Sequence, residues 1–363
     1  MAALMAACTV VGGAVAMPVA PGPGYRLLQF SENNVSWVPI AQIEEFSANS
    51  SSPHPNFFDV TDSILRSRAP RAREAVAIPQ EPIHDELVRG YLEQLAPDGA
   101  FETITKLSSY FTRYYTSTTG RDAVLWLKDE YEKAAGNRPD VQIELFEHTW
   151  LQPSLVVTLY GKGDNRDETV VLGGHIDSTA GAATAEAPGA DDDASGSAVV
   201  LEVFRTLMVN RYEPDRTVEF HAYAAEEVGL RGSQAVAENY DTFGRNVVSM
   251  LQMDMVGYPL NTNTPIGLTT DFVNEPLSTF VGKCITTYSR LTHQPSTCGY
   301  ACSDHASWTK VNVPSCFPFE SKFGTHNPAI HTKNDVVENM SRDRTNEFVK
   351  FGLGYVVELS LNP

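Results

Sequence analysis

The sequence predicts an α/β fold in which helices cover both faces of a central sheet. From about residue 80 onward, short apolar or alternating stretches that are typical of strands take turns with longer stretches whose apolar residues recur at helical spacing. This alternation is characteristic of a sheet that lies between two layers of helices. We find no internal repeat, so we interpret residues 78–363 as one domain.

Each predicted element rests on its own pattern. Helices are predicted at 101–115 and 122–135, and Gly136 ends the second of them. Residues 141–145 alternate between apolar and polar side chains, as expected for a half-buried strand. Further strands are predicted at 154–160, 169–174, 217–224 and 247–255, and further helices at 195–209, 230–240, 276–290 and 345–361.

Composition and charge limit the classes of function. A hydrophobic content of 42% with 20% charged residues is ordinary for a globular protein. The net charge of -18 argues against nucleic-acid binding, which requires a basic face to neutralise phosphates. Beyond the first residues, no segment approaches the roughly 20 apolar residues that a membrane span needs. We therefore expect neither nucleic acid nor membrane as a partner.

The first 77 residues differ from the rest. Residues 1–16 form an uncharged, mostly small and apolar run, which is typical of a secretory signal peptide although no Lys or Arg precedes it; a buried N-terminal segment is the alternative. Residues 17–77 are rich in Pro, Ser and Asn and end in a basic cluster at 66–73. This pattern predicts a propeptide with an exposed processing site, and a permanent N-terminal extension is the alternative. We expect a secreted, extracellular protein.

The cysteines agree with secretion. Cys298 and Cys302 are close enough in sequence for a small disulfide loop, because Gly299 eases the turn. A Cys-x3-Cys pair could instead be half of a zinc site, but no second Cys or His pair at finger spacing follows it. The sequence does not indicate a role for Cys284 or Cys316. Glycosylation sequons occur at Asn34, Asn49 and Asn339.

Side chains that could carry chemistry gather at five positions near the ends of predicted strands, where open α/β sheets place their sites. At the first, His175 and Asp177 share one face of a strand, so the carboxylate can orient a metal-binding imidazole. A lone His-x-Asp pair is more often part of an ordinary core. The second position is the run of three mutually repelling aspartates at 191–193. Its placement between a long loop of small residues and an apolar helix favours a deeply held cation, and a calcium loop or a solvated helix cap is the alternative.

The remaining positions are also acidic or imidazole side chains. Glu226 and Glu227 end an apolar strand, where two carboxylates are costly to bury without a cation or a proton. Asp254 ends another apolar strand, and like His331 it would be an ordinary polar residue if it stood alone. Together the five positions predict a two-metal hydrolase site with ions about 3.5–4 Å apart. Nitrogen and oxygen ligands without thiolate favour zinc, with cobalt or manganese as substitutes.

The motifs around these residues resemble those of the secreted leucine aminopeptidases of the co-catalytic zinc metallopeptidase superfamily, peptidase family 28. The resemblance extends over about 85–360, in the order of the family. It rests on residues 173–178, 187–196, 224–233, 298–308, 318–323 and on His331. The resemblance implies a single catalytic domain with a mixed, mostly parallel eight-stranded sheet sandwiched between helices, which is the zinc-dependent exopeptidase fold.

The resemblance also implies a ligand set for two zinc ions. Asp192 would bridge the two ions. His175 and Glu227 would complete one zinc site, and Asp254 and His331 would complete the other. These residues stand at the matching positions of the family motifs.

The remaining catalytic roles follow from the same resemblance. Glu226 would be the general base, and Asp177 would support the neighbouring imidazole. Two zinc ions lower the pKa of a bridging water toward about 7, and Glu226 would pass its proton to the leaving amine after attack on the scissile carbonyl. The hydroxyl of Tyr300 would help to stabilise the oxyanion. The peptide bond Asp192–Asp193 is expected to be cis.

The implied substrates are peptides with free hydrophobic N-termini, with leucine preferred, and the enzyme is expected to be a monomer. The positions that line the specificity pocket in the family are Met255, Tyr300, Phe319, Phe323 and Ile330, for which plain core packing is the alternative. The chain departs from the family at two of the neighbouring positions, with His326 in place of a pocket tyrosine and Phe317 in place of a methionine. These changes could shift the preference among large side chains or make binding sensitive to pH through His326.

Three rival functions remain open at this point. A carboxypeptidase on the same scaffold needs a cation for the substrate carboxylate, and Arg231 is the only arginine within the motifs. A glutaminyl cyclase usually runs with one zinc, whereas this chain keeps ligands for two. A non-catalytic binding ectodomain should have lost ligands or the base, and all six positions are intact.

Overall fold

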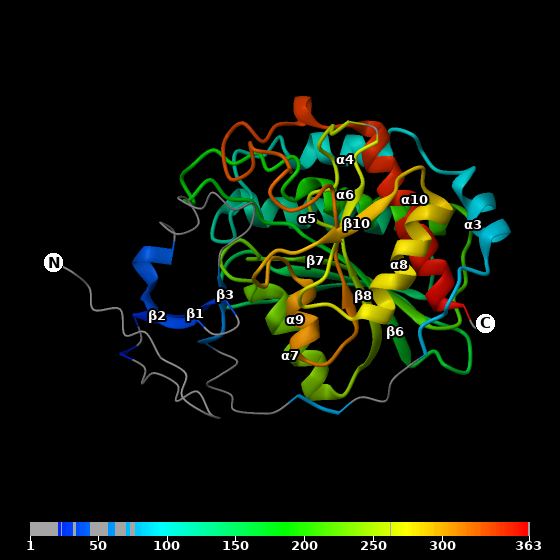
Figure 1. Ribbon diagram of the computed structural model, residues 1–363, viewed down its shortest axis with the longest axis horizontal. Coiled ribbons are helices and arrows are strands. Elements are labelled where there is room, and N and C mark those ends of the chain that lie inside the picture. Colours follow the sequence, from blue (N-terminus) through cyan, green and yellow to red (C-terminus); the bar gives the residue numbers. More distant parts are fainter. Residues whose placement is uncertain are drawn as a thin grey trace.

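The computed structural model describes residues 21–22, 24–31, 34–43, 57–61, 70–72, 77–261 and 263–361. The predicted signal peptide, the sequon at Asn49 and most of the basic cluster at 66–73 lie outside these residues. The described chain forms a large α/β domain with a small separate sheet beside it (Figure 1).

The central sheet has six strands in the order β11-β8-β6-β7-β5-β4. Their bounds are β4 (Val141–Phe146), β5 (Ser154–Leu159), β6 (Glu168–His175), β7 (Thr217–Tyr223), β8 (Asn246–Gln252) and β11 (Ser315–Cys316). The strands from β11 to β7 are parallel, whereas β5 runs antiparallel to both of its neighbours. The sheet is therefore mixed and mostly parallel, as expected.

The expectation of eight strands in this sheet is wrong, because three short strands form a sheet of their own. β9 (Ile266–Thr269) lies between β10 (His293–Ser296) and β12 (Pro318–Phe319). The chain leaves the central sheet just after β11, where the carbonyl of Phe317 accepts a hydrogen bond from Thr269 N at 3.0 Å. β12 then pairs antiparallel with β9, so these strands cannot widen the central sheet.

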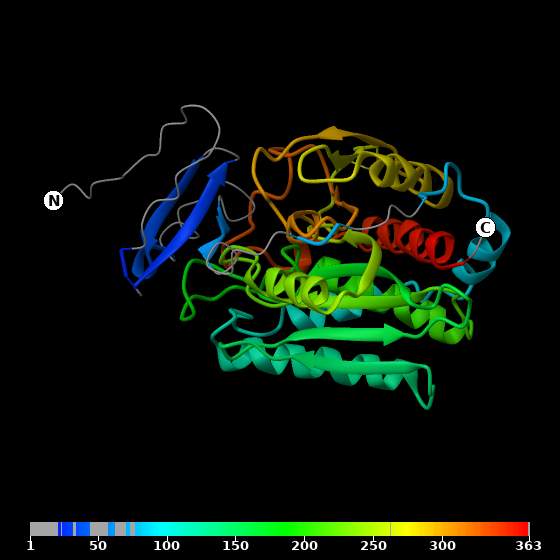
Figure 2. The ribbon, with the colours of Figure 1, turned by 90° about the horizontal axis from the view of Figure 1, so that it is seen from below.

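Helices cover both faces of the central sheet (Figure 2). One layer contains α3 (Asp85–Leu92), α4 (Gly99–Leu107), α5 (Thr118–Ala135), α6 (Ala194–Val209), α8 (Glu275–Tyr288) and α10 (Arg342–Ser360). The other layer contains α7 (Arg231–Phe243) and α9 (His305–Lys310), and a 3₁₀ turn, η1 (Val337–Asn339), precedes α10. Alternate residues of β6 serve the two faces, since Val170 and Leu172 pack in the first core and Val171 packs in the second. None of the helices in the described ranges combines the length and the apolar character that crossing a membrane requires.

The strands and helices predicted for the catalytic region are confirmed, with one large shift in a boundary. The first predicted helix ends at Leu107 rather than near residue 115. The hydroxyls of Ser108 and Ser109 bond back to carbonyls of the last turn, and the side chain of Arg113 is buried against the carbonyls of a distant loop. The pattern missed the short elements α3, α9 and β9 to β12.

The region that was predicted to be an irregular propeptide contains a small antiparallel sheet. Its strands are β1 (Tyr25–Ser31), β2 (Asn34–Pro39) and β3 (Phe58–Asp59), in the order β2-β1-β3. This sheet, which we call the N-terminal sheet, lies beside one end of the catalytic domain (Figure 2). The described part of the region is therefore folded, which its composition did not indicate.

Helix α6 runs through the larger layer and is buried over most of its length. Asp193 caps it by accepting a hydrogen bond from Gly196 N. Glu202 is buried on this helix with Arg205 Nη1 at 3.5 Å, and burial raises the pKa of the Glu202 carboxyl to about 7.

We expect Glu202→Gln to stabilise the protein at about pH 8 but not at about pH 4, because the folded-state pKa of about 7 exceeds the ordinary value of 4.5. Between pH 4.5 and about 7, this carboxyl ionises in the unfolded chain but stays neutral in the folded protein, so the folded state loses stability as pH rises. Below this range the carboxyl is neutral in both states. Thermal midpoints of the variant and the wild type at both pH values test this. Glu86→Gln, on an exposed side chain of α3, is the control. Equal shifts at both pH values would contradict the prediction.

Candidate metal centre

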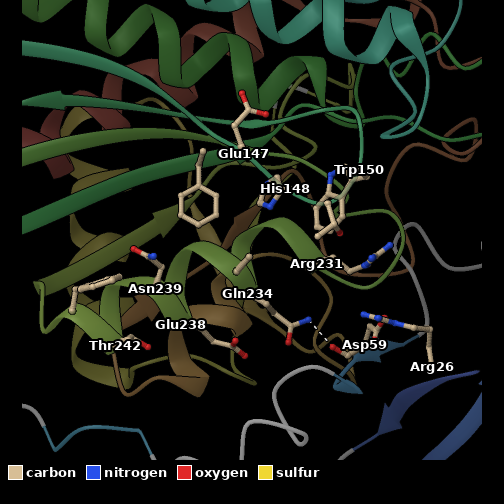
Figure 3. A pocket seen from close by; sticks show the side chains of 14 residues that line it. Arg26, Asp59, Glu147, His148, Trp150, Arg231, Gln234, Glu238, Asn239 and Thr242 are labelled. Carbon is tan, nitrogen blue, oxygen red and sulfur yellow. Dashed lines mark hydrogen bonds and ion pairs between the residues drawn. The ribbon is translucent and has the colours of Figure 1, made fainter. Parts of the chain in front are cut away.

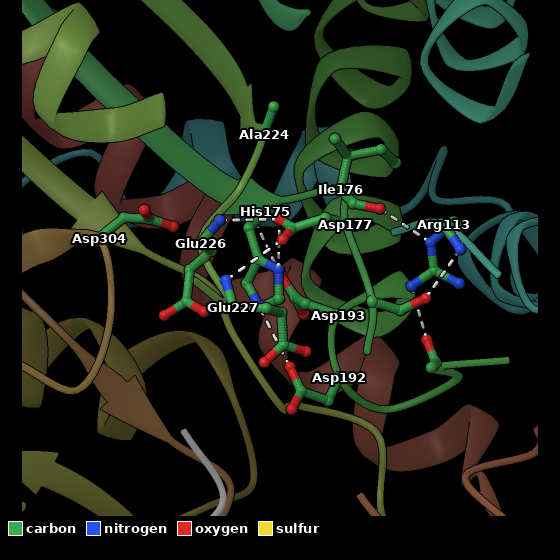
Figure 4. A network of polar contacts seen from close by, with 12 residues as sticks. Arg113, His175, Ile176, Asp177, Asp192, Asp193, Ala224, Glu226, Glu227 and Asp304 are labelled. Atoms are coloured by element: carbon green, nitrogen blue, oxygen red, sulfur yellow. Dashed lines mark hydrogen bonds and ion pairs between the residues drawn. The ribbon is translucent and has the colours of Figure 1, made fainter. Parts of the chain in front are cut away.

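Three neighbouring strands deliver imidazole and carboxylate side chains to one edge of the central sheet (Figure 4). His175 is the last residue of β6. Glu226 and Glu227 lie in the turn after β7, and Asp254 follows β8 by two residues. Because β8, β6 and β7 are adjacent and parallel, their carboxyl ends meet, and all four side chains are buried there.

Asp192 lies between two imidazoles. Its Oδ1 is 3.0 Å from Nε2 of His175, and its Oδ2 is 3.0 Å from Nε2 of His331. The peptide bond Asp192–Asp193 is cis, as expected. His331 does not end a strand; it lies in a loop before η1, with a positive φ of 54°. The two oxygens of one carboxylate thus face two separate groups of side chains.

The structure divides the candidate ligands differently from the expected pairing. His175, Asp192 and Asp254 form one group, and Asp192, Glu227 and His331 form the other, with candidate ligand atoms in each group within 4.8 Å of one another. The expectation that His175 pairs with Glu227 and Asp254 with His331 is therefore wrong. β6 lies between β8 and β7, so strand order allows either partner, and the side-chain positions decide: His175 Nε2 is 3.6 Å from Asp254 Oδ1, whereas Glu227 Oε2 is 2.9 Å from His331 Nε2.

The buried charges of the two groups depend on one another. Burial alone would raise the pKa of Asp192, but hydrogen bonds with His175 and His331 outweigh it and lower the pKa of this carboxyl. Burial likewise opposes the charged form of His175, yet the nearby Asp254 and Glu226 raise its pKa well above the ordinary value. Burial raises the pKa of Glu227 to about 7. Such a concentration of buried carboxylates requires positive charge.

The donor set fits zinc. Each group offers one imidazole and two carboxylates, which matches a catalytic zinc site with three protein ligands and an open position. The shared Asp192 brings the two groups close enough to form a two-metal site. Among the described residues, the two thiols are elsewhere: Cys284 and Cys316 are buried in the core.

Asp177 supports both sides of this site. Its Oδ1 is 3.4 Å from Nδ1 of His175, whereas the other ring nitrogen, Nε2, faces Asp192. Its two oxygens also accept hydrogen bonds from the backbone N–H groups of Glu226, at 3.0 Å, and of Glu227, at 3.2 Å. One buried carboxylate thus fixes an imidazole and the turn that carries two glutamates.

Sequence reasoning missed a second buried cluster that holds the bridging aspartate and the His331 loop together. Asp335 accepts hydrogen bonds from the backbone N–H groups of Asp191 and Asp192 at 3.1 Å. The amide of Asn327 donates to Asp335 at 3.2 Å and to Asp191 at 3.1 Å. Asn327 and Asp335 flank His331 in sequence, and this bracketing was the signal that could have found them.

Ser303 and Asp304 lie in the motif at 298–308, but the sequence pattern did not indicate a role for either of them. Ser303 Oγ donates to Asp254 Oδ2 at 2.6 Å, which orients that carboxylate. The next residue, Asp304, is buried beside Glu226 and accepts a hydrogen bond from Gln252 Nε2 at 3.0 Å (Figure 4). Burial raises the pKa of the Asp304 carboxyl to about 7.

The predicted pocket residues lie together in one apolar cluster. The cluster contains Met255, Tyr300, Phe319, Phe323 and Ile330, with Phe317, Cys298 and Cys302. The structure contains the predicted disulfide between these two cysteines. The ring of His326 lies 5.5 Å from the rings of both Phe319 and Phe323. The role of this cluster in substrate binding stays a prediction.

We expect Asp335→Ala to weaken metal binding by about 10- to 100-fold, because its loss frees the backbone at Asp192 and the loop of His331 together. Zinc affinity is measured by competition with a chelating dye. Asp343→Ala is the matched control, since this aspartate is exposed at the start of α10. Affinity equal to that of the control would show that Asp335 does not support the ligands.

Comparison with known proteins agrees with this geometry. The model of peptidase family M28 matches residues 154–356 of the chain, the part that contains the six candidate ligand and base residues. The chain is 35% identical over 362 residues to a protein named probable leucine aminopeptidase from Arthroderma otae, with 98% of each chain covered. It is 36% identical to leucine aminopeptidase 1 of Coccidioides posadasii, with 94% of this chain and 91% of the relative covered.

A solved structure is similar over nearly the whole chain as well. The LapA aminopeptidase of Legionella pneumophila matches with a TM-score of 0.82 and 30% identity, and the match covers 96% of this chain and 95% of that protein. Similarity of fold thus extends beyond the matched family region to the N-terminal part of the chain.

Proposed function

This chain belongs to peptidase family M28 and is a zinc aminopeptidase similar to leucine aminopeptidases, and we propose that it removes hydrophobic residues, leucine foremost, from the free amino ends of extracellular peptides. The observation that carries the proposal is the placement of Asp192 between two ligand groups with Glu226 beside them. The apolar cluster around Met255 and Phe319 supports the preference for large apolar side chains.

Two zinc ions are proposed for this site. His175, Asp192 and Asp254 would hold one ion, and Asp192, Glu227 and His331 would hold the other. When bound, the ions lower the pKa of water and polarise the scissile carbonyl.

Glu226 is the proposed general base. It is fully buried, and within the described residues neither of its carboxylate oxygens has a hydrogen-bond partner. Burial raises the pKa of this carboxyl well above its ordinary value, because its charged form is removed from water. Asp177 fixes the backbone N–H of Glu226, so the carboxylate can receive a proton from the attacking water and deliver it to the leaving amine. The hydroxyl of Tyr300 is proposed to stabilise the oxyanion.

The rival functions receive no support from the geometry. Arg231, the cation that a carboxypeptidase would need, lies with its guanidinium carbon 4.5 Å from the ring centroid of Trp150, where it lines a different cavity. The two ligand groups do not favour a one-zinc cyclase. All the ligands and Glu226 are present, which does not favour a non-catalytic ectodomain.

We also propose that the protein is secreted as a monomeric precursor, with a signal peptide at 1–16, a propeptide at 17–77 and glycosylation at its sequons. The disulfide Cys298–Cys302 supports an oxidising compartment. Asn34 is exposed, as a glycosylated asparagine must be.

The direct test of the proposed function uses a leucyl chromogenic amide beside the same compound with an acetylated amine. We expect purified protein to cleave only the free-amine substrate, and a zinc chelator to abolish cleavage until zinc is returned. Cleavage of neither compound by protein that holds two zinc ions would refute the aminopeptidase assignment.

Glu226→Gln should lower kcat by about 10²- to 10⁴-fold, because the amide keeps the shape of the side chain but cannot accept the proton. Both zinc ions should remain, since the ligand groups do not include this residue. Steady-state kinetics and metal analysis of the same preparations measure the two effects, with the exposed Glu102→Gln as the control. Loss of zinc in the variant would instead make Glu226 a ligand.

A further inference from the structure

We propose that the N-terminal sheet is a working part of the enzyme: it holds the turn that carries Glu226 and Glu227, and it stays docked after cleavage within the basic cluster at 66–73. This inference rests on the proposed aminopeptidase function. It gives the sheet a supporting role, whereas a simple inhibitory propeptide would have to leave before activity appears.

The sheet contacts the turn directly through its backbone. Asp59 N, in β3, donates to the carbonyl of Gly229 at 3.2 Å. Gln234 Nε2, on α7, donates to the carbonyl of Asp59 at 2.8 Å and to that of Gly229 at 2.9 Å. One side chain of the catalytic domain therefore joins the strand and the turn.

The fit at Gly229 leaves no space for a side chain. A Cβ at this position would lie 2.8 Å from both the N and the Cβ of Asp59, and Gly229 has a φ of 99°. Because β3 approaches the turn this closely, the turn and the sheet cannot shift independently.

Apolar side chains surround this contact. Leu27, Phe58 and Val60 of the N-terminal part share a buried cluster with Leu230, Ala301 and Ala306 of the catalytic domain. The ammonium of Lys310, at the end of α9, lies 4.7 Å from the centroid of the Phe58 ring. Burial of this cluster, which includes the fully buried Leu230, favours docking without a covalent link.

The docking strand is itself firmly joined to β1. Arg26 Nε donates to Asp59 Oδ2 at 2.6 Å, and the other oxygen of Asp59 accepts from the N–H and the hydroxyl of Thr61 at 3.0 and 2.6 Å. Leu27 N in turn donates to the Thr61 hydroxyl at 2.6 Å. The N-terminal sheet thus presents β3 to the catalytic domain as a rigid edge.

The turn needs such support because of its backbone conformation. Ala225, Gly229 and Leu230 have positive φ angles of 57°, 99° and 59°. Positive φ is unfavourable for the two residues that have a side chain, and surrounding contacts must maintain it. Asp177 holds the start of the turn at the N–H groups of Glu226 and Glu227, and β3 holds its end at Gly229.

The docking contact is local. Beside it lies a cavity of about 680 Å³, whose lining includes Arg26 and Asp59 on one side and Trp150, Arg231 and Gln234 on the other (Figure 3). The hydrogen bond from Gln234 to the carbonyl of Asp59 lies at the edge of this cavity, so the contact between the N-terminal sheet and the turn is made by β3 and its immediate neighbours.

The first experiment measures docking by chromatography and then compares the kcat of the cut and the uncut protein. A recognition sequence for a site-specific protease replaces residues 66–69 of the chain, and the protein is cut there. We expect the two fragments to co-elute in size-exclusion chromatography and kcat for the leucyl amide to stay within about twofold of the uncut protein, because the contacts with Gly229 and Gln234 persist. Release of the N-terminal fragment, or a large rise in kcat after cutting, would overturn the proposal.

The second experiment weakens the apolar contact between the Phe58 ring and the catalytic domain. Phe58→Ser should lower kcat by about tenfold with a smaller change in KM, because a small displacement of the base costs rate more than binding. Phe58→Leu should restore most of the rate. Tyr25→Ser is the control, since Tyr25 is an exposed aromatic side chain at the start of β1. Unchanged or increased kcat in Phe58→Ser would refute the supporting role.

The two experiments also separate this inference from the proposed function. Uncut wild-type protein that does not hydrolyse the leucyl amide would refute the function, while co-elution of the fragments would still report docking. Thermal unfolding and zinc content of each variant show whether it is folded. If Phe58→Ser does not fold, the cut protein decides the question.

Discussion

The structure depends on how buried carboxylates are kept close together. Asp192, Asp254, Glu226 and Glu227 are buried at one edge of the sheet with only two imidazoles in the ligand groups. Negative charges so close together repel one another strongly in a medium of low polarity, so the fold is stable only with cations, protons or donors aimed at them. The two proposed zinc ions would satisfy this requirement and would supply the chemistry of hydrolysis at the same point.

The three consecutive aspartates have different partners, which lowers the cost of burying three carboxylates side by side. Only Asp192 faces both ligand groups. Asp193 turns away to cap α6 and to accept from the backbone N–H of His175 at 3.0 Å, and Asp191 accepts from Gly257 N at 3.0 Å and from Asn327. Two of the three carboxylates therefore position backbone, and their hydrogen bonds with N–H groups offset part of the cost of their burial.

Much of the fold and of the candidate site could be predicted from the sequence, because both the alternation of strands with helices and the acidic residues at strand ends are local patterns. The pairing of His175 with Asp254 could not, since β6 lies between β8 and β7 and only the positions of the side chains in space decide between Asp254 and Glu227. Asp335 was missed for the same reason: its partners are backbone N–H groups more than a hundred residues away. The N-terminal sheet was missed because its region is rich in turn-forming residues and because β3 has only two residues.

The sheet topology determines which strand ends lie beside the turn after β7. β8 and β6 are parallel to β7, so on that side the turn has other strand ends as neighbours, including those that carry His175 and Asp254. On its other side β5 runs antiparallel and brings only its first residue, with Ser154 Oγ accepting from Ala224 N at 3.0 Å. Beyond that bond the flank is occupied by the loop before β5 and by the cavity that Arg231 and Asp59 line. A mixed sheet thus gives the catalytic turn strand ends as neighbours on one side only, and β3 adds a backbone contact at Gly229 beside the one that Gln234 of the domain makes.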